Sequence, residues 1–354
     1  MKMQQAFLKS ALFGAMLASG AASATTLLLP GPNEMSTGLY HDFEIYSLDL
    51  LEQCAAAGDL RCLPSGPFPV QSSPGQISDQ AVVLTGSDGT QMNNVTSPFA
   101  TGSAVDNPFL TPSGNQSNTF EMTSANEPAS GAHGGDGFPG GGDQAGTWEV
   151  SISLLRDWLG TSNLVFLFDN NQDGTSAGQT LLVWAQAKII DGSGNQAGGQ
   201  CYEISGHLGT TGCGSVPALN NNNGDYLPVV GDFCVDKVTG VSYDYGLVGN
   251  TGDCAGTSVA HPAGGYYVSN NISTSVAEFA AYNKSLETAV KSGAYDNYFL
   301  SINTKYLAND AGYEQLWICS DCDIDHKVPE PAALGLLGIG LLGMFAVSRR
   351  RLSK

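Results

Sequence analysis

The C-terminal end of this chain constrains its folding more than any other stretch. Residues Ala332–Val347 form an unbroken apolar run of 16 residues, which would be about 24 Å long as a helix. That length is marginal for a hydrocarbon core of about 30 Å. Arg349, Arg350 and Arg351 follow shortly after the run, and such basic clusters stay on the cytoplasmic side of a membrane. We therefore predict a transmembrane helix over residues 332–347, with everything before it outside the cytoplasm.

The motif Pro329-Glu330-Pro331 comes directly before this run. A Pro-Glu-Pro motif, a short glycine-rich span and an arginine cluster, in this order, resemble the PEP-CTERM sorting signal, here residues 328–354. The resemblance implies recognition and cleavage near the motif by an exosortase in the inner membrane of a Gram-negative bacterium. The protein would be anchored in the membrane only transiently, and would then reach the cell surface or the extracellular matrix. A plain single-span anchor is the alternative.

The N-terminal end indicates export as well. Lys2 and Lys9 supply a positive region, Ala11–Ala18 is apolar, and Ala22-Ser23-Ala24 is a small-residue cleavage site. These three features are typical of a secretory signal peptide, here residues 1–24. We expect the Sec machinery to export the chain and the mature protein to begin at Thr25.

The exported part, residues 25–327, is strongly acidic. It holds eight Lys and Arg against 32 Asp and Glu, a net charge of −24. Such a surface repels nucleic acid and suits divalent cations. The 45 glycines and the 13% of charged residues favour a mainly β, antiparallel, sandwich-like fold with long Gly-, Asn- and Ser-rich loops and one or two helices. The region is one domain, or two subdomains with a break near residues 191–200.

All eight cysteines lie in this exported part. An even number of cysteines in an exported chain indicates disulfides. Eight cysteines allow 105 pairings, and proximity in sequence favours Cys54–Cys62, Cys201–Cys213, Cys234–Cys254 and Cys319–Cys322.

Local patterns predict individual elements. A helix is expected at 46–57, with Ser47 as its N-cap and Gly58 as its end, and a helical turn is expected at 154–159 before Gly160. The strongest helix signal runs from the capping box Ser275-x-x-Glu278 to Gly293. Strands are expected at 80–85, 118–123, 148–152, 164–168, 181–190, 226–230, 233–236, and 297–304 with 314–319 as a closing pair.

The loop between the strands at 164–168 and 181–190 resembles the first half of a calcium-binding loop. Asp169, Asn171 and Asp173 alternate and Gly174 follows, as in loops whose alternate oxygens face one ion. Thr180 stands where such a loop carries a bidentate Glu. An Asx-rich hairpin turn explains the same residues without metal. We therefore expect no cofactor, with calcium as the alternative.

No catalytic motif is found. The five histidines are widely spaced, and Gly131–Gly146 is interpreted as a flexible surface loop. Glu149, beside Trp148, is the single acid singled out as a catalytic candidate. Stretches 147–160, 164–172, 181–191 and 308–318 resemble those of a recurring PEP-CTERM ectodomain, which implies an exported surface protein without an assigned activity.

Two functions from different classes stay open. The first is a non-enzymatic surface or matrix protein that contacts exopolysaccharide through exposed aromatics and Asn/Asp-rich loops. The second is a secreted polysaccharide hydrolase, which needs two carboxylates about 5–9.5 Å apart. Since no catalytic motif is found, the first is favoured.

Overall fold

The structure is a computed structural model of the 354-residue chain. It describes residues 26–31, 35, 38–73, 75–88, 91–92, 98–100, 103–111, 119–128, 141–170, 181–207, 211–219, 225–228, 233–237, 242–244, 265–268, 275–307 and 314–324. The predicted signal peptide and sorting signal lie outside these ranges. Within them, no helix combines the length and the apolar character needed to cross a bilayer.

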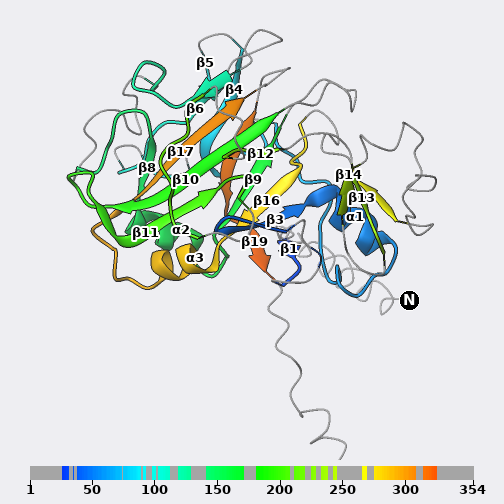
Figure 1. Cartoon of the computed structure of the whole chain (residues 1–354). Helices are drawn as coiled ribbons and strands as arrows, with labels where there is room; N and C mark the ends of the chain where they lie inside the picture. The colour runs from blue at the N-terminus through cyan, green and yellow to red at the C-terminus, as the bar shows by residue number, and fades with distance from the viewer. Residues whose placement is uncertain are drawn as a thin grey trace, which may run out of the picture.

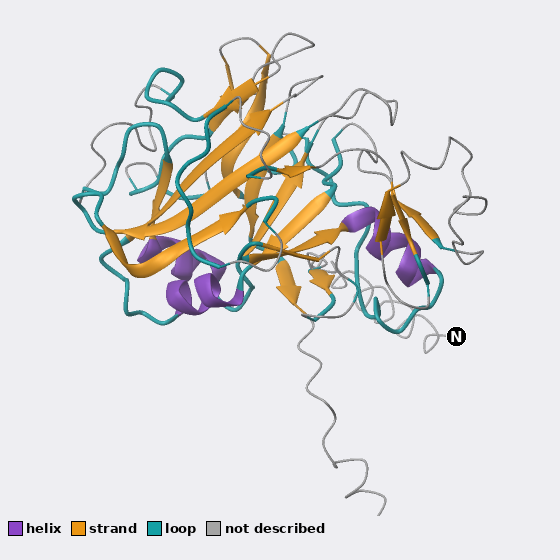
Figure 2. Cartoon of the chain, viewed as in Figure 1, coloured by secondary structure: helices purple, strands orange, loops and turns teal. Residues whose placement is uncertain are grey.

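Two large sheets dominate the fold (Figures 1 and 2). The eight-stranded sheet has the order β2 (Gly38–Tyr40), β3 (Phe43–Ser47), β16 (Phe279–Tyr282), β9 (Val165–Asp169), β18 (Gln315–Cys319), β4 (Ala81–Asp88), β5 (Gln91–Met92), with β6 (Phe109–Thr111) beside β4. The six-stranded sheet has the order β11 (Gln196–Ile204), β10 (Leu182–Ile190), β17 (Phe299–Leu307), β7 (Thr119–Glu121), with β12 (Leu227–Pro228) on β10 and β8 (Trp148–Ser151) on β17.

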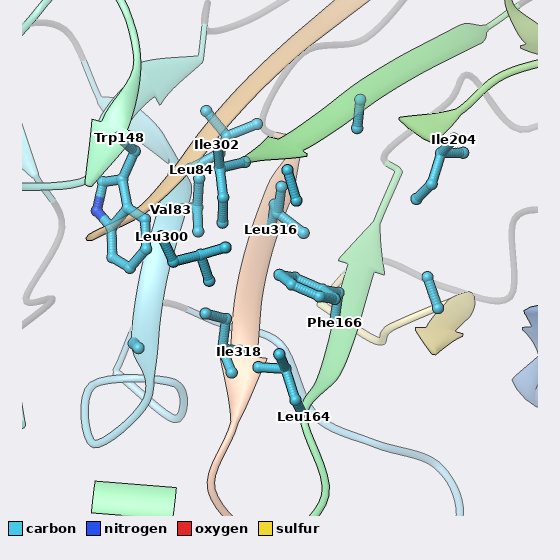
Figure 3. Packing of buried hydrophobic residues seen from close by; sticks show 14 of the residues in the cluster. Val83, Leu84, Trp148, Leu164, Phe166, Ile204, Leu300, Ile302, Leu316 and Ile318 are labelled. Atoms are coloured by element: carbon cyan, nitrogen blue, oxygen red, sulfur yellow. The ribbon is translucent and has the colours of Figure 1, made fainter. Parts of the chain in front are cut away.

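The main core lies between these two sheets. Side chains alternate along each strand, so Phe166 and Phe168 of β9 point toward the six-stranded sheet, and Leu300 and Ile302 of β17 point back. In Figure 3, Ile302 of β17 and Leu316 of β18 lie side by side in this core. The structure is therefore mainly β and sandwich-like, as predicted.

The other face of the eight-stranded sheet is covered too. Val165 and Leu167 of β9 and Trp317 of β18 pack there in a second core. The covering elements are α1 (Leu48–Ala56), the parallel pair β1 (Leu27–Leu29) and β19 (Cys322–Ile324), and the small sheet β14 (Ser242–Asp244), β13 (Phe233–Val235), β15 (Tyr266–Val268). Burial on both faces explains why the strand at 164–168 is continuously apolar rather than alternating.

The described residues contain three helices, where the sequence predicted one or two. α1 begins after Ser47, whose Oγ accepts a hydrogen bond from the Leu50 backbone N–H, and Gly58 follows its end with a positive φ of 73°. α2 (Ile152–Leu159) ends at Gly160, as expected. The third helix is α3 (Lys284–Lys291), which packs beside α2 (Figure 1).

The long helix predicted from Ser275 to Gly293 is wrong in its first half. Phe279–Tyr282 forms strand β16 between β3 and β9, and the helix starts only after its N-cap Asn283. Ala280 and Ala281 are fully buried on opposite faces of the sheet. A central strand with both faces covered therefore overrides the local capping box at Ser275.

Strands that are close in sequence join different sheets. The two strands predicted on either side of the 169–179 loop are confirmed as β9 and β10, but β9 pairs with β16 and β18 while β10 pairs with β11 and β17, so they do not form a hairpin. The predicted closing pair β17 and β18 is divided between the two sheets in the same way. Residues 191–195 form the tight connection between β10 and β11, which pair in one sheet across the suggested break at 191–200.

Three of the four predicted cysteine pairs are confirmed. Disulfides join Cys54 to Cys62, Cys201 to Cys213, and Cys319 to Cys322. Cys234 is disulfide-bonded as well, while Cys254, its predicted partner, lies outside the described residues. The described cysteines therefore include no free thiol.

Candidate functional site

The outer face of the six-stranded sheet carries a row of polar side chains. Val183, Ala185, Ala187 and Ile189 of β10 point into the core, so the residues between them point outward. Lys188 is opposite Ser301 of β17, and Ser301 is opposite Glu149 of β8. At the next outward-facing position of the same two strands, Gln186 of β10 is opposite Asn303 of β17. Pairing of strands from distant parts of the chain thus builds this polar surface.

A cavity of about 150 Å³ opens over this row. Its wall presents amides, hydroxyls and one amine together with apolar surface, and is lined by Gln144, Thr147, Gln186, Lys188, Ile190, Gly194, Ser301 and Asn303. No carboxylate is among these lining residues, and Lys188 forms no ion pair with any described residue. The cavity therefore offers hydrogen-bond donors and acceptors together with one positive charge.

The segment 141–147 covers one end of this outer face. The backbone N–H of Gly142 donates to Gly192 O at 3.0 Å, and a Cβ on Gly142 would lie 2.2 Å from the ring of Phe299. Gly142 also has a φ of +96°, which glycine adopts readily. The prediction of a flexible surface loop over 131–146 is therefore wrong for residues 141–146, where glycine permits close packing on the sheet. Residues 131–140 lie outside the described ranges.

A second segment, 211–219, covers the other end. The Cys201–Cys213 disulfide ties it to β11. The backbone N–H of Gly214 donates to Glu203 Oε2 at 3.1 Å, and Lys305 Nζ donates to Pro217 O at 3.0 Å. The cavity thus lies over the part of the sheet between the two covering segments. Specific contacts hold both segments on the sheet.

Three carboxylates from three segments meet beside the cavity. Asp106 comes from the segment that pairs with β8, Asp143 from the covering segment, and Glu149 from β8 itself. One oxygen of each lies within 4.8 Å of the others. Glu149 is fully buried and Asp106 is 7% exposed. Because all three ligand atoms are oxygens, this cluster could hold a hard metal ion.

Hydrogen bonds link the cluster to the cavity wall. Ser301 Oγ donates to Glu149 Oε1 at 2.5 Å, and Thr147 Oγ1 donates to the same oxygen. Both hydroxyls belong to residues that line the cavity. The backbone N–H of Gln144 donates to Glu149 Oε2 at 3.3 Å. On the other side, the backbone N–H of Glu149 donates to Asp106 Oδ2 at 2.6 Å. Glu149 therefore holds two hydroxyls of the cavity wall in place.

Burial raises the pKa of both Asp106 and Glu149. For Asp106, the negative charges of Glu149 and Asp143 raise the pKa further. For Glu149, hydrogen bonds from Ser301 and Thr147 oppose the effect of burial in part. Without a bound cation, the pair therefore keeps a proton at pH values where isolated carboxyl groups are ionised.

The predicted calcium-loop residue Asp169 lies elsewhere, at the end of β9. Its Oδ2 accepts hydrogen bonds from Ser72 Oγ and, at 3.1 Å, from Gln315 Nε2. Burial raises the pKa of Asp169 to about 7, although these two hydrogen bonds act in the opposite direction. Asn171 and Asp173 lie outside the described residues, so whether the loop binds calcium stays a prediction.

Sequence reasoning named one member of the carboxylate cluster and missed two. Glu149 was singled out on its strand, but Asp106 lies 43 positions away in a stretch with no recognisable pattern. Asp143 lies in the glycine-rich stretch that was interpreted as a surface loop. The glycines beside Asp143 were the available signal, since they indicate close backbone approach as well as flexibility.

Tryptophans do not form an exposed binding platform in the described part of the chain. Trp148, Trp184 and Trp317 are fully buried, and Trp158 packs against Phe99. The large exposed hydrophobic residues there are Leu39, Leu60 and Val216, none of which is aromatic. The expectation of contact through exposed aromatics is therefore wrong for these tryptophans, because they fill the cores instead.

Comparison with known families covers most of the chain. The model of a family described as a domain of unknown function (DUF8239) matches residues 27–305, and that of the PEP-CTERM protein-sorting motif matches residues 327–351. No curated protein and no solved structure matches the chain significantly. The first match includes the cavity and all three carboxylates, and the second confirms the resemblance of the tail. The chain therefore belongs to the DUF8239 family, and its PEP-CTERM motif marks it as an exosortase-sorted exported protein.

Proposed function

We propose that this exported protein binds a saccharide unit of an extracellular polysaccharide in the cavity on the outer face of the six-stranded sheet. The observation that carries the proposal is the composition of the cavity wall. Gln186 and Asn303 offer amides, Ser301 and Thr147 hydroxyls, and Lys188 an amine. Sugar hydroxyls both donate and accept hydrogen bonds, so they match such a mixed wall. A volume of about 150 Å³ suits one ring of a polymer rather than a long stretch.

A binding role is favoured over hydrolysis by the position of the acids. A retaining glycosidase needs two carboxyl groups about 5–5.5 Å apart that both reach the substrate, and an inverting one needs a larger separation. Asp106 and Glu149 are buried and do not line the cavity. Glu149 serves instead as an acceptor for the hydroxyls of the wall. We therefore propose a non-enzymatic role.

The test is a glycan array probed with the exported protein, run beside an assay for released reducing sugar. We expect binding to at least one glycan with no release. Lys188→Ala should weaken that binding about tenfold or more, equivalent to about 1.4 kcal/mol. Lys237→Ala, a change of the same charge on the opposite side of the fold, serves as the control. Release of reducing sugar would support the hydrolase alternative, and absence of binding to every glycan would contradict the proposal.

We also propose that the chain is processed at both ends before it reaches the cell surface or matrix. The motif match at 327–351 supports exosortase cleavage near Pro329-Glu330-Pro331, and the Ala22-Ser23-Ala24 site supports removal of residues 1–24 after Sec export. Intact-mass measurement of the exported protein should show that both residues 1–24 and the C-terminal arginine cluster are missing. A mature species that retains Arg349–Arg351 would indicate a plain anchor instead.

A further inference from the structure

The three clustered carboxylates lie close enough together to bind one calcium ion. Calcium is bound by oxygens at about 2.3–2.6 Å, so two ligands on opposite sides of one ion are at most about 5 Å apart. One oxygen each from Asp106, Asp143 and Glu149 lies within 4.8 Å of the others. A magnesium ion usually keeps several waters and is bound through one or two carboxylates, whereas three carboxylates meet here. Zinc prefers nitrogen and sulfur ligands.

A separate observation points to a ligand at the same place. Asp106 Oδ1 is buried and has no hydrogen-bond partner among the described residues. The other oxygen, Oδ2, accepts a hydrogen bond from the backbone N–H of Glu149. This bond fixes the carboxyl group and leaves Oδ1 able to bind a ligand. Buried polar atoms are almost always satisfied by protein, water or an ion. This oxygen is therefore available to a bound cation.

The two buried acids of the cluster, Asp106 and Glu149, have no basic side chain beside them among the described residues. Neither Asp106 nor Glu149 takes part in any ion pair of the described residues. Buried charges are normally paired with an opposite charge or coordinate a metal. Glu149 accepts hydrogen bonds from two hydroxyls and a backbone N–H and shares one with Asp106, and none of these groups supplies a positive charge.

We propose that Asp106, Asp143 and Glu149 bind one calcium ion beside the cavity. The ion would join the segment that carries Asp106, the covering segment that carries Asp143, and strand β8. Since Glu149 also holds the hydroxyls of Ser301 and Thr147, the bound ion fixes one wall of the cavity. This inference concerns the ion itself and stands whether or not the cavity binds a saccharide.

The test is calorimetric titration of calcium into the full chain, purified in mild detergent and stripped of metal with a chelator, without any glycan. We expect saturable calcium binding to this site and a higher melting temperature in calcium than in chelator. Asp143→Asn should weaken calcium binding about tenfold or more, because ligand charge sets the affinity of such sites. Asp143 is the ligand of choice because it is less buried than the other two.

Asp157→Asn is the matched control, since it removes the same charge from an exposed position on α2 and should leave calcium binding unchanged. Glu149→Gln is a second variant, for which folding is checked by circular dichroism. A folded wild-type chain that binds no calcium would overturn the proposal. Equal calcium binding by the wild type, Asp143→Asn and a folded Glu149→Gln would overturn it too.

Discussion

Ser301 donates its hydroxyl hydrogen to Glu149 across the β8–β17 pair, with 2.5 Å between Ser301 Oγ and Glu149 Oε1. Ser301 faces the cavity, whereas Glu149 is completely buried. This single contact therefore connects a surface that can meet a ligand with an acid in the interior. It also explains how a fully buried carboxylate is tolerated, because its oxygens accept hydrogen bonds from three donors.

Ser301→Ala should destabilise the fold. The substitution removes one donor from a buried carboxylate, and leaving a buried acceptor without its partner costs about 1–3 kcal/mol. Urea unfolding at neutral pH measures the change in the free energy of unfolding. Ser193→Ala, at an exposed position in the β10–β11 turn, is the control and should change it by less than about 0.5 kcal/mol. Equal stability of the two variants would show that the Ser301 contact contributes little.

Glu287 should make the stability depend on pH in an acidic window. Its carboxylate accepts a 2.6 Å hydrogen bond from Tyr282 Oη and forms ion pairs with Lys284 and Lys291. Burial raises its pKa, but hydrogen bonds from Tyr282, Asn163 and Lys284 and the charge of Lys291 outweigh burial and lower the pKa to about 2. A lowered pKa means that the ionised form stabilises the fold. This contribution is complete above about pH 4.5 and is lost as the pH falls toward 2.

Glu287→Gln tests this dependence. We expect the variant to be about 1–3 kcal/mol less stable than the wild type at pH 6, and this difference should shrink steadily between pH 4.5 and pH 2. Denaturant unfolding at several pH values measures it. The partly exposed Glu52 of α1 provides Glu52→Gln as a control with the same change of charge. A difference that stays constant down to pH 2 would contradict the assignment.

Gly142→Ala should be destabilising because two effects act together. The added Cβ would lie 2.2 Å from the Phe299 ring, and the residue would keep a φ of +96°. Overpacking alone costs about 1–3 kcal/mol. The melting temperature should therefore fall by several degrees. Gly198→Ala is the control, since Gly198 has no atom within 4 Å of the new Cβ. Similar melting temperatures for the two variants would mean that the segment moves aside at little cost.

Local signals predicted the parts of the fold that depend on local chemistry. Ser47 caps α1 and Gly160 ends α2, because capping and positive φ are properties of single residues. Three neighbouring cysteine pairs formed as expected, because short loops bring their ends together readily. In contrast, Phe279–Tyr282 was predicted as helix and is a central strand, since two distant strands and two cores decide its conformation.

The candidate site could not be predicted without knowing which strands are neighbours. Lys188, Ser301 and Glu149 are brought together by the registers of β10, β17 and β8, and no sequence pattern specifies which of many strands will be neighbours. Asp106 joins through a single bridge between Val105 and Val150. A chain with 33 acids offers many combinations of three, so the sequence alone could not select this one.

The last prediction concerns the loop that begins at Asp169, for which the sequence left a calcium site and a turn as alternatives. Asp169 Oδ2 already accepts two hydrogen bonds, and the Gln315 N–H group that faces it would repel a cation at that oxygen. Asp169 Oδ1 and Gln315 Oε1 have no partner among the described residues, which keeps the alternative testable. We expect the turn.

The measurement is the rise in melting temperature between chelator and calcium. At a hundredfold excess over Kd, calcium bound at the Asp106, Asp143 and Glu149 cluster stabilises the fold by about 2.7 kcal/mol, which is several degrees for a domain of this size. Asp173→Ala should show the same rise as the wild type, whereas Asp143→Asn should lose it. Loss of the rise in Asp173→Ala, with the rise intact in Asp143→Asn, would instead identify the Asp169 loop as the calcium site.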